Sequence, residues 1–188
     1  MKIAVIGCAG RMGRNNLKAA SAHAELELVA GVETPGHPAL GRDLGVLAGT
    51  EPIGITAHDD AAAAFDAADA AIEFSSPAAT VHHAGMAAVR GCALVVGTTG
   101  LEAVHERALA EAGERVPIVY APNMSLGVNL LMALVETVAR ALDPDFDVEI
   151  VELHHNEKVD APSGTALGLG RAAARGRGVD LAAVAERG

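Results

Sequence analysis

A run of titratable and hydrogen-bonding side chains, ELHHNEKVDAPSGTA, occupies residues 152–166. One imidazole, from His154 or His155, titrates near neutral pH and can give or take a proton. Lys158 is a compact cation that can hold a carboxylate or donate a proton. The Ser-Gly-Thr sequence at 163–165 adds hydroxyl and amide groups where a helix is expected to begin, which is typical of anion sites. We therefore predict a site that combines proton transfer with the binding of a small dicarboxylate.

Two other interpretations of this run stay open. A metal site would need converging ligands, but adjacent histidines at the end of a strand point to opposite sides, which disfavours joint coordination of one ion. The run could also be a solvated polar loop with no ligand. The acidic side chains Glu152, Glu157 and Asp160 are interpreted as supporting or solvated carboxylates.

A glycine pattern near the N-terminus, GCAGRMG, predicts a nucleotide site. It follows the apolar run KIAVIG, which is typical of a strand, and precedes a stretch with helical spacing. Gly7 permits the tight turn, Gly10 lets the backbone approach a pyrophosphate, and Gly13 lets the helix pack close to the sheet. Glu33 lies about 20 residues after Gly13, where an acid holds the adenosine ribose hydroxyls. The alternative is a tight turn without a ligand.

Two further expected strand ends carry small and polar residues. GTTG spans residues 97–100, and APNMS spans residues 121–125. Ligands of open α/β sheets bind outside the carboxyl ends of the strands, so both segments could approach a flat ring. Each segment taken singly could also be an ordinary loop.

Strands alternate with helices over the first part of the chain, which predicts an α/β fold with a Rossmann-type doubly wound parallel sheet. Residues 34–50 are expected to form a loop because of their many glycines and prolines. The pattern changes near residue 123. We therefore predict a dinucleotide-binding domain over 1–123 and a second domain over 124–188, in which 145–155 read as a strand.

Composition excludes several classes of function. A net charge of −10 and 2% aromatic residues disfavour nucleic-acid binding. No apolar run is long enough to span a membrane. Cys8 and Cys92 are too few for a disulfide framework, so we expect a cytoplasmic protein in which each cysteine fills a small buried site. His82 and His83 are expected to be exposed on a helix and to have no role.

The motifs GCAGRMG, GTTG, APNMSLGVN and ELHHNEKVDAPSGTA together resemble the 4-hydroxy-tetrahydrodipicolinate reductase (dihydrodipicolinate reductase) family. The resemblance extends from residue 3 to about residue 175, and the last motif is the most specific. It implies hydride transfer from NADH or NADPH to a cyclic unsaturated dicarboxylate, giving tetrahydrodipicolinate in lysine and diaminopimelate biosynthesis. It also implies a homotetramer in the full-length protein.

The resemblance also assigns residues to roles. His154 matches the acid–base histidine and Lys158 the proton-donating lysine. The substrate carboxylates would be held by His155, Lys158, Ser163, Gly164 and Thr165. The cofactor would be held by Gly7, Cys8, Ala9, Gly10, Arg11, Met12, Gly13, Glu33, Gly97, Thr98, Thr99, Ala121, Pro122, Asn123 and Met124. No metal is expected.

This sequence departs from the family in two respects. Many relatives carry an arginine after the ribose-binding acid, whereas this chain has Thr34, which slightly favours NADH over NADPH. Family members also continue well beyond the position of Gly188, so the resemblance implies a fragment of a longer protein, in which 124–188 begin an α+β substrate-binding and tetramerisation domain that is incomplete here. The remaining alternatives are a non-catalytic module that binds NADH and a different Rossmann dehydrogenase acting on a semialdehyde or a sugar.

Overall fold

The computed structural model describes residues 1–121, 123–154, 156 and 161–186. The chain forms two compact units, residues 1–121 and 122–188, which are described separately below. No helix in the described ranges is both long and apolar enough to cross a lipid bilayer.

The first unit is built on one six-stranded sheet whose named strands all pair in parallel. The strands are β1 (Lys2–Ile6), β2 (Glu27–Val32), β3 (Ala57–His58), β4 (Ala70–Glu73), β5 (Ala93–Val96) and β6 (Ile118–Tyr120). Their order across the sheet is β3-β2-β1-β4-β5-β6, so the direction of winding reverses between β1 and β4. This arrangement confirms the predicted doubly wound Rossmann-type fold.

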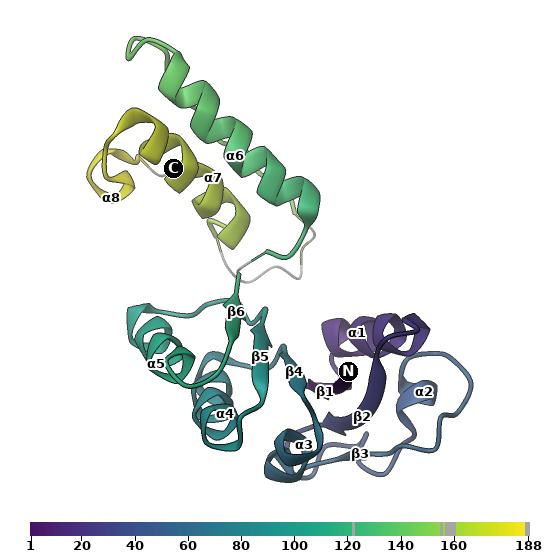
Figure 1. Cartoon of the computed structure of the whole chain (residues 1–188). Helices are drawn as coiled ribbons and strands as arrows, with labels where there is room; N and C mark the ends of the chain where they lie inside the picture. The colour runs from purple at the N-terminus through teal and green to yellow at the C-terminus, as the bar shows by residue number, and fades with distance from the viewer. Residues whose placement is uncertain (122, 155, 157–160, 187–188) are drawn as a thin grey trace. The chain divides into compact units, whose positions relative to one another are not determined.

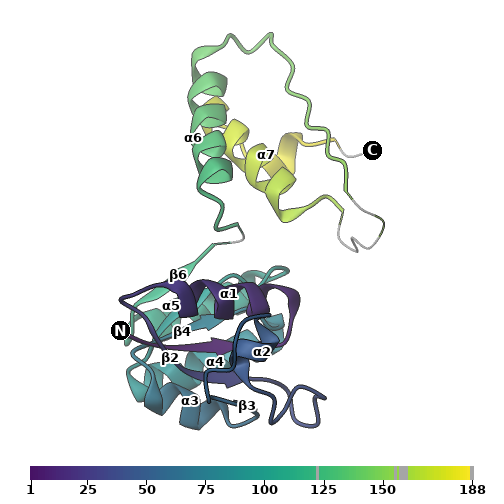
Figure 2. The ribbon, with the colours of Figure 1, turned by 90° about the vertical axis from the view of Figure 1, so that its right-hand side faces the viewer.

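Helices cover both faces of the sheet (Figures 1 and 2). They are α1 (Arg11–Ala22), α2 (Leu44–Leu47), α3 (Ala61–Ala67), α4 (Pro77–Arg90) and α5 (Ala103–Gly113). One core cluster holds buried residues of α1 and α2, and the other holds buried residues of α3, α4 and α5. The right-handed crossovers of parallel strands place helices on both faces in this way.

The strand β1 shows why both faces must be covered. Ile3 and Val5 belong to the cluster beneath α1 and α2, whereas Ala4 and Ile6 belong to the cluster on the other face. Successive side chains of a strand point to opposite faces, so a strand that is apolar at every position needs cover on both sides. The small alanines of this core allow the helices to lie close to the sheet.

The loop expected over residues 34–50 contains the short helix α2. The carboxylate of Asp43 caps this helix, accepting hydrogen bonds from the backbone N–H groups of Gly45 at 2.8 Å and Val46 at 3.3 Å. It also accepts from the N–H groups of Ile53 and Gly54. One aspartate therefore organises a segment whose glycines and prolines favour a loop.

The second unit contains α6 (Leu126–Ala141), α7 (Gly164–Arg177) and α8 (Leu181–Val184). The helices α6 and α7 lie side by side in both views (Figures 1 and 2). A Cβ at Gly176 would lie 2.4 Å from the carbonyl oxygen of Glu136, so α7 approaches the backbone of α6 closely. The Nε of Arg175 donates a 3.0 Å hydrogen bond to Glu136.

The strand expected over residues 145–155 is absent from the described part of this segment. Residues 147–154 belong to no helix or strand, and Leu153 is 93% exposed. A strand is defined by hydrogen bonds to a neighbour, and alternation of apolar and polar residues supplies only the pattern for one. Among the described residues of this unit, no strand is present to serve as that neighbour.

Candidate functional site

The glycine loop joins β1 to α1 in a conformation that needs glycine. Gly7 has a φ of +71°, and its N–H donates to the carbonyl of Val32 at 2.9 Å. A Cβ at Gly13 would lie 2.0 Å from the carbonyl oxygen of Gly7, so the first turn of α1 rests directly on the loop. This close packing is the role that the glycine pattern predicted for Gly13.

The N-terminus of α1 has features that could hold a phosphate group. Gly10 is its N-cap and provides no side-chain hydrogen bond, and the first turn carries no acidic side chain. Gly10 and Arg11 are exposed, so the free amides and the positive end of the helix dipole face solvent. The guanidinium of Arg14 is turned back and donates from Nε to the carbonyl of Ala9 at 2.8 Å.

The structure brings Glu33 to the glycine loop. One carboxylate oxygen accepts from the N–H of Ala9 at 2.8 Å, and the other accepts from the N–H of Thr34 at 3.2 Å. The acid at the end of β2 therefore lies against the glycine loop, and its predicted role in holding the adenosine ribose stays a prediction. Cys8 lies in the same loop but is fully buried, and burial followed by the charge of Glu33 raises its pKa to about 12. Its N–H donates to the carbonyl of Val32 at 3.1 Å, so neither the side chain nor the amide of Cys8 is free for a ligand.

Phe74 lies between two segments that were predicted to bind the cofactor. A Cβ at Gly7 would lie 2.6 Å from the carbonyl oxygen of Phe74, and a Cβ at Gly97 would lie 2.0 Å from its ring. The glycine loop and the GTTG segment therefore both pack against the residue that follows β4. Glycine at 7 and 97 is needed for this contact.

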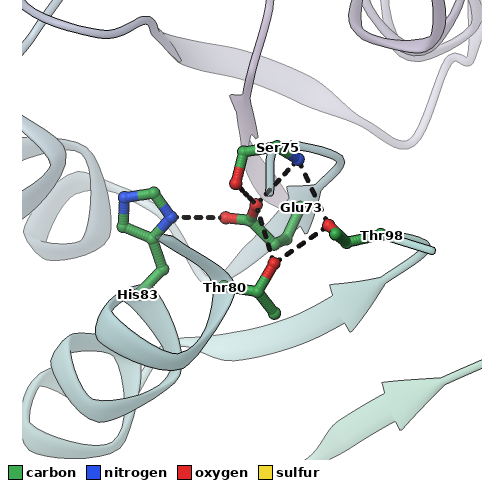
Figure 3. A network of polar contacts seen from close by, with 5 residues as sticks. All are labelled: Glu73, Ser75, Thr80, His83 and Thr98. Carbon is green, nitrogen blue, oxygen red and sulfur yellow. Dashed lines mark hydrogen bonds and ion pairs between the residues drawn. The ribbon is translucent and has the colours of Figure 1, made fainter. Parts of the chain in front are cut away.

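Thr98 faces the interior of the unit, and Thr99 is exposed. The Thr98 hydroxyl oxygen accepts a hydrogen bond from the Thr80 hydroxyl at 2.9 Å and one from the Ser75 N–H at 3.2 Å (Figure 3). Thr98 could therefore contribute to a cofactor site mainly through its backbone, whereas Thr99 can present its side chain.

A buried carboxylate, missed by the sequence-based prediction, lies beneath this loop. Glu73, the last residue of β4, is 0% exposed. One of its oxygens lies 2.7 Å from Nδ1 of His83, whose side chain is only 13% exposed (Figure 3). The expectation that His83 is exposed is therefore wrong. A glutamate within an apolar strand was the signal, since such a group is rarely buried without a partner.

In the second unit, Asn123 contacts the start of α7. Its side-chain amide donates to the Thr165 hydroxyl at 3.0 Å, and its Oδ1 accepts from the N–H of Ser125 at 2.8 Å. Asn129 donates to the carbonyl of Asn123 at 3.1 Å, which ties this segment to α6. A residue predicted for the cofactor thus touches a residue predicted for the substrate.

Glu152 connects two other predicted residues. Its Oε1 accepts from the N–H of Ser163 at 2.8 Å, and its Oε2 lies 3.6 Å from Nδ1 of His154. Ser163 is buried and caps α7 through a bond from the N–H of Ala166. His154 is about one-third exposed and remains accessible. Pro122, His155 and Lys158 lie outside the described residues. Within the described ranges, no three His, Cys, Asp or Glu side chains gather as metal ligands would.

Comparison with known proteins assigns both units of the chain to the same family. Residues 1–124 match the family model "Dihydrodipicolinate reductase, N-terminus", and residues 127–187 match "Dihydrodipicolinate reductase, C-terminus". A 4-hydroxy-tetrahydrodipicolinate reductase of Cereibacter sphaeroides is 55% identical over 180 residues, covering 96% of this chain and 67% of the relative. One from Parvibaculum lavamentivorans is 53% identical, covering 100% of this chain and 70% of the relative.

A solved structure shares the fold. It is a dipicolinate-bound dihydrodipicolinate reductase from Paenisporosarcina sp. TG-14, with a TM-score of 0.73 and 24% identity. The match covers 94% of this chain and 66% of that one. The 188-residue chain therefore spans about two thirds of the length of these relatives.

Proposed function

Because the chain belongs to the dihydrodipicolinate reductase family, whose members are NAD(P)H-dependent oxidoreductases, we propose that it carries the reduction of 4-hydroxy-tetrahydrodipicolinate to tetrahydrodipicolinate in lysine and diaminopimelate biosynthesis. The observation that carries the proposal within the structure is the contact between the Glu33 carboxylate and the glycine loop. That contact assembles the two halves of a dinucleotide site from residues far apart in the sequence.

The first unit would hold the dinucleotide. The uncapped start of α1 would bind the pyrophosphate, and Glu33 would accept hydrogen bonds from the adenosine ribose. Within this unit, the segment at 97–99 and Ala121 would line the nicotinamide end. When bound, the reduced dinucleotide supplies the hydride for the reaction. The residues of this unit bind and orient it.

The second unit would hold the substrate and manage protons. His154 and Lys158 would supply the proton that the reaction consumes, because hydride addition leaves an electron-rich centre. The 4-hydroxyl group of the substrate leaves as water, so one hydride and one proton enter for each water released. His155 and Lys158, with Ser163, Gly164 and Thr165, would bind the carboxylates through charge-assisted and backbone hydrogen bonds. The relative that binds dipicolinate supports a cyclic dicarboxylate as the ligand class.

We propose a modest preference for NADH over NADPH. A free ribose can donate to Glu33, whereas a 2′-phosphate would be repelled by its carboxylate. Thr34 offers no cation to offset this repulsion, and the Nε of the nearby Arg14 is engaged by the carbonyl of Ala9. Comparing the Kd of the two cofactors tests this preference directly.

We further propose that the protein works as a cytoplasmic homotetramer. In support of self-association, α6 exposes a row of large apolar side chains, with Leu126 at 86% exposure. Leu130, Leu134 and Val138 continue the row at helical spacing. In support of the location, both cysteines are free and buried, as suits a reducing compartment.

The test of the proposed function compares two histidine variants in the 188-residue chain. His154→Gln is expected to reduce the rate of NADH oxidation with freshly prepared substrate by about a hundredfold or more, with NADH affinity unchanged. His23→Gln, which changes an exposed histidine at the far end of α1, serves as the control.

The assignment of His154 as the acid–base residue would be wrong if both variants lost turnover equally. It would also be wrong if His154→Gln lost turnover and NADH affinity to the same extent. Binding of NADH without turnover by the unmodified chain would favour a non-catalytic nucleotide-binding module over the reductase.

A further inference from the structure

The segment at 73–75 lies where the direction of the sheet reverses. The strand β4 neighbours β1 on one side and β5 on the other, and ligands of such sheets bind outside this point. The carbonyl oxygen of Phe74 packs against Gly7, and its ring packs against Gly97. Any shift of this segment would therefore reach both the glycine loop and the GTTG segment.

Glu73 fixes this segment through a set of short contacts (Figure 3). Its Oε1 accepts hydrogen bonds from the N–H of Ser75 at 3.0 Å and from the Ser75 hydroxyl. The Thr80 hydroxyl lies 3.4 Å from the same oxygen, and Oε2 faces Nδ1 of His83 at 2.7 Å. A fully buried carboxylate is tolerated only when it is well partnered, and here both oxygens have partners.

Thr80 links Glu73 to the GTTG segment. Its hydroxyl lies between Oε1 of Glu73 and the hydroxyl of Thr98, 2.9 Å away. The N–H of Ser75 likewise lies close to both the Glu73 carboxylate and the Thr98 hydroxyl. The orientation of Thr98 is thus set by the residues that Glu73 holds, and Thr98 in turn sets the backbone that presents Thr99.

We propose that Glu73 is a positioning residue for the nicotinamide end of the cofactor site, acting through Ser75 and Thr80 on Thr98. The inference rests on the proposed function, since it takes 97–99 as the nicotinamide side. His83 stabilises the carboxylate that makes this arrangement possible. In this arrangement only the segment at 97–99 touches the cofactor, and Glu73 acts on it from beneath.

A purely structural role predicts a different result from a positioning role. Loss of general stability would weaken all nucleotide ligands alike, because they share the glycine loop. Loss of positioning at 97–99 would weaken only ligands that contain nicotinamide. NADH and ADP-ribose separate the two cases, because ADP-ribose retains the adenosine and pyrophosphate and lacks the nicotinamide ring.

The experiment measures the Kd of NADH and of ADP-ribose by calorimetry for the 188-residue chain and its variants. Thr80→Val keeps the branched shape of the side chain and removes the hydroxyl that bonds Thr98. We expect it to raise the Kd of NADH about fivefold and to leave that of ADP-ribose within about twofold. Glu73→Gln is likewise expected to raise the ratio of the Kd of NADH to the Kd of ADP-ribose.

Two control variants match these changes chemically. Thr137→Val removes a hydroxyl that bonds the carbonyl of Ala133 in α6. Asp69→Asn alters a carboxylate at the other end of β4, where it accepts from the N–H of Lys2 at 2.7 Å. Both controls are expected to leave the ratio of the two dissociation constants unchanged.

Thr80→Val tests the positioning role even if Glu73→Gln fails to fold. If Thr80→Val weakens both ligands equally, or neither, while the unmodified chain binds both, the positioning role is wrong and the proposed function stands. If the unmodified chain binds neither ligand, the proposed function fails, and the inference fails with it.

Discussion

Replacing Gly13 by alanine should destabilise the first unit, although alanine is the better helix former. Gly13 lies in the first turn of α1, and the new Cβ would be 2.0 Å from the carbonyl oxygen of Gly7. It would also be 2.7 Å from Cα of Cys8. Because these neighbours are backbone atoms, no side-chain rotation can relieve the clash, and the loop must move away from the helix.

The magnitude follows from two opposing effects. Alanine favours a helix over glycine by about 1 kcal/mol, whereas overpacking a tight site costs typically about 1–3 kcal/mol. A clash with backbone belongs at the upper end of that range, so we expect a net loss of about 2 kcal/mol in the free energy of unfolding. NADH affinity should fall as well, since the loop that binds pyrophosphate is displaced.

Gly85 provides a matched control within the same unit. It lies inside α4, and a Cβ there would meet no heavy atom within 4 Å. Gly85→Ala should therefore raise the free energy of unfolding by about 0.5–1 kcal/mol. Urea unfolding followed by far-ultraviolet circular dichroism measures both variants. A Gly13→Ala variant as stable as the unmodified chain would refute the packing argument, and equal losses in both variants would show that alanine itself is the cause.

Three further predictions concern charged and nucleophilic groups. Glu33→Gln should weaken NADH binding roughly tenfold and reduce the discrimination against NADPH, measured as the ratio of the two Kd values; an unchanged ratio would contradict the ribose assignment. Desolvation raises the pKa of Asp43, but four backbone N–H donors outweigh it and lower that pKa below its ordinary 3.8. The loss in free energy of unfolding caused by Asp43→Asn should therefore be largest above pH 3.8 and shrink as the pH falls further. If the two proteins still differed in free energy of unfolding at the lowest pH of an acid titration, this role of the Asp43 carboxylate would be contradicted. Burial raises the pKa of Cys8 to about 12 and that of Cys92 to about 11, so neither thiol should react with a thiol reagent at pH 8 until denaturant is added; rapid labelling of the folded chain would contradict this.

The parts of the molecule that the sequence predicts well are those set by local geometry. The turn at Gly7 and the close packing of Gly13 depend on residues within one strand–turn–helix unit, so the glycine pattern contains them. The position of Glu33 follows from the length of one such unit, because the next parallel strand ends at the same edge of the sheet. The Ala9–Glu33 hydrogen bond is the result.

The pairing of Glu73 with His83 could not be predicted from local pattern. His82 and His83 are adjacent, but consecutive helical residues point about 100° apart, so one faces water and the other faces the sheet. Which of the two turns inward depends on how α4 lies across β4. The buried positions Ala84 and Ala87 mark the inner face of the helix, and His83 adjoins it.

The strand expected over 145–155 is absent from the described residues of that segment for a different reason. Its alternation of apolar and polar residues is a genuine strand pattern, yet ladder pairing requires a neighbouring strand that the local sequence does not contain. Propensity for a strand is largely the ability to fit beside other strands. Most of the described residues there are exposed, and none belongs to a strand.

The contact between the ring of Phe74 and the bare backbone of Gly97 has an evolutionary consequence. The ring occupies the space that any side chain at position 97 would need, so the two positions share one fixed volume. Neither residue can change size alone without cost, and substitutions there should appear as a pair. In an alignment of homologues, chains with a side chain at the position of Gly97 should carry a smaller residue at the position of Phe74, and Phe74→Leu should partly rescue Gly97→Ala.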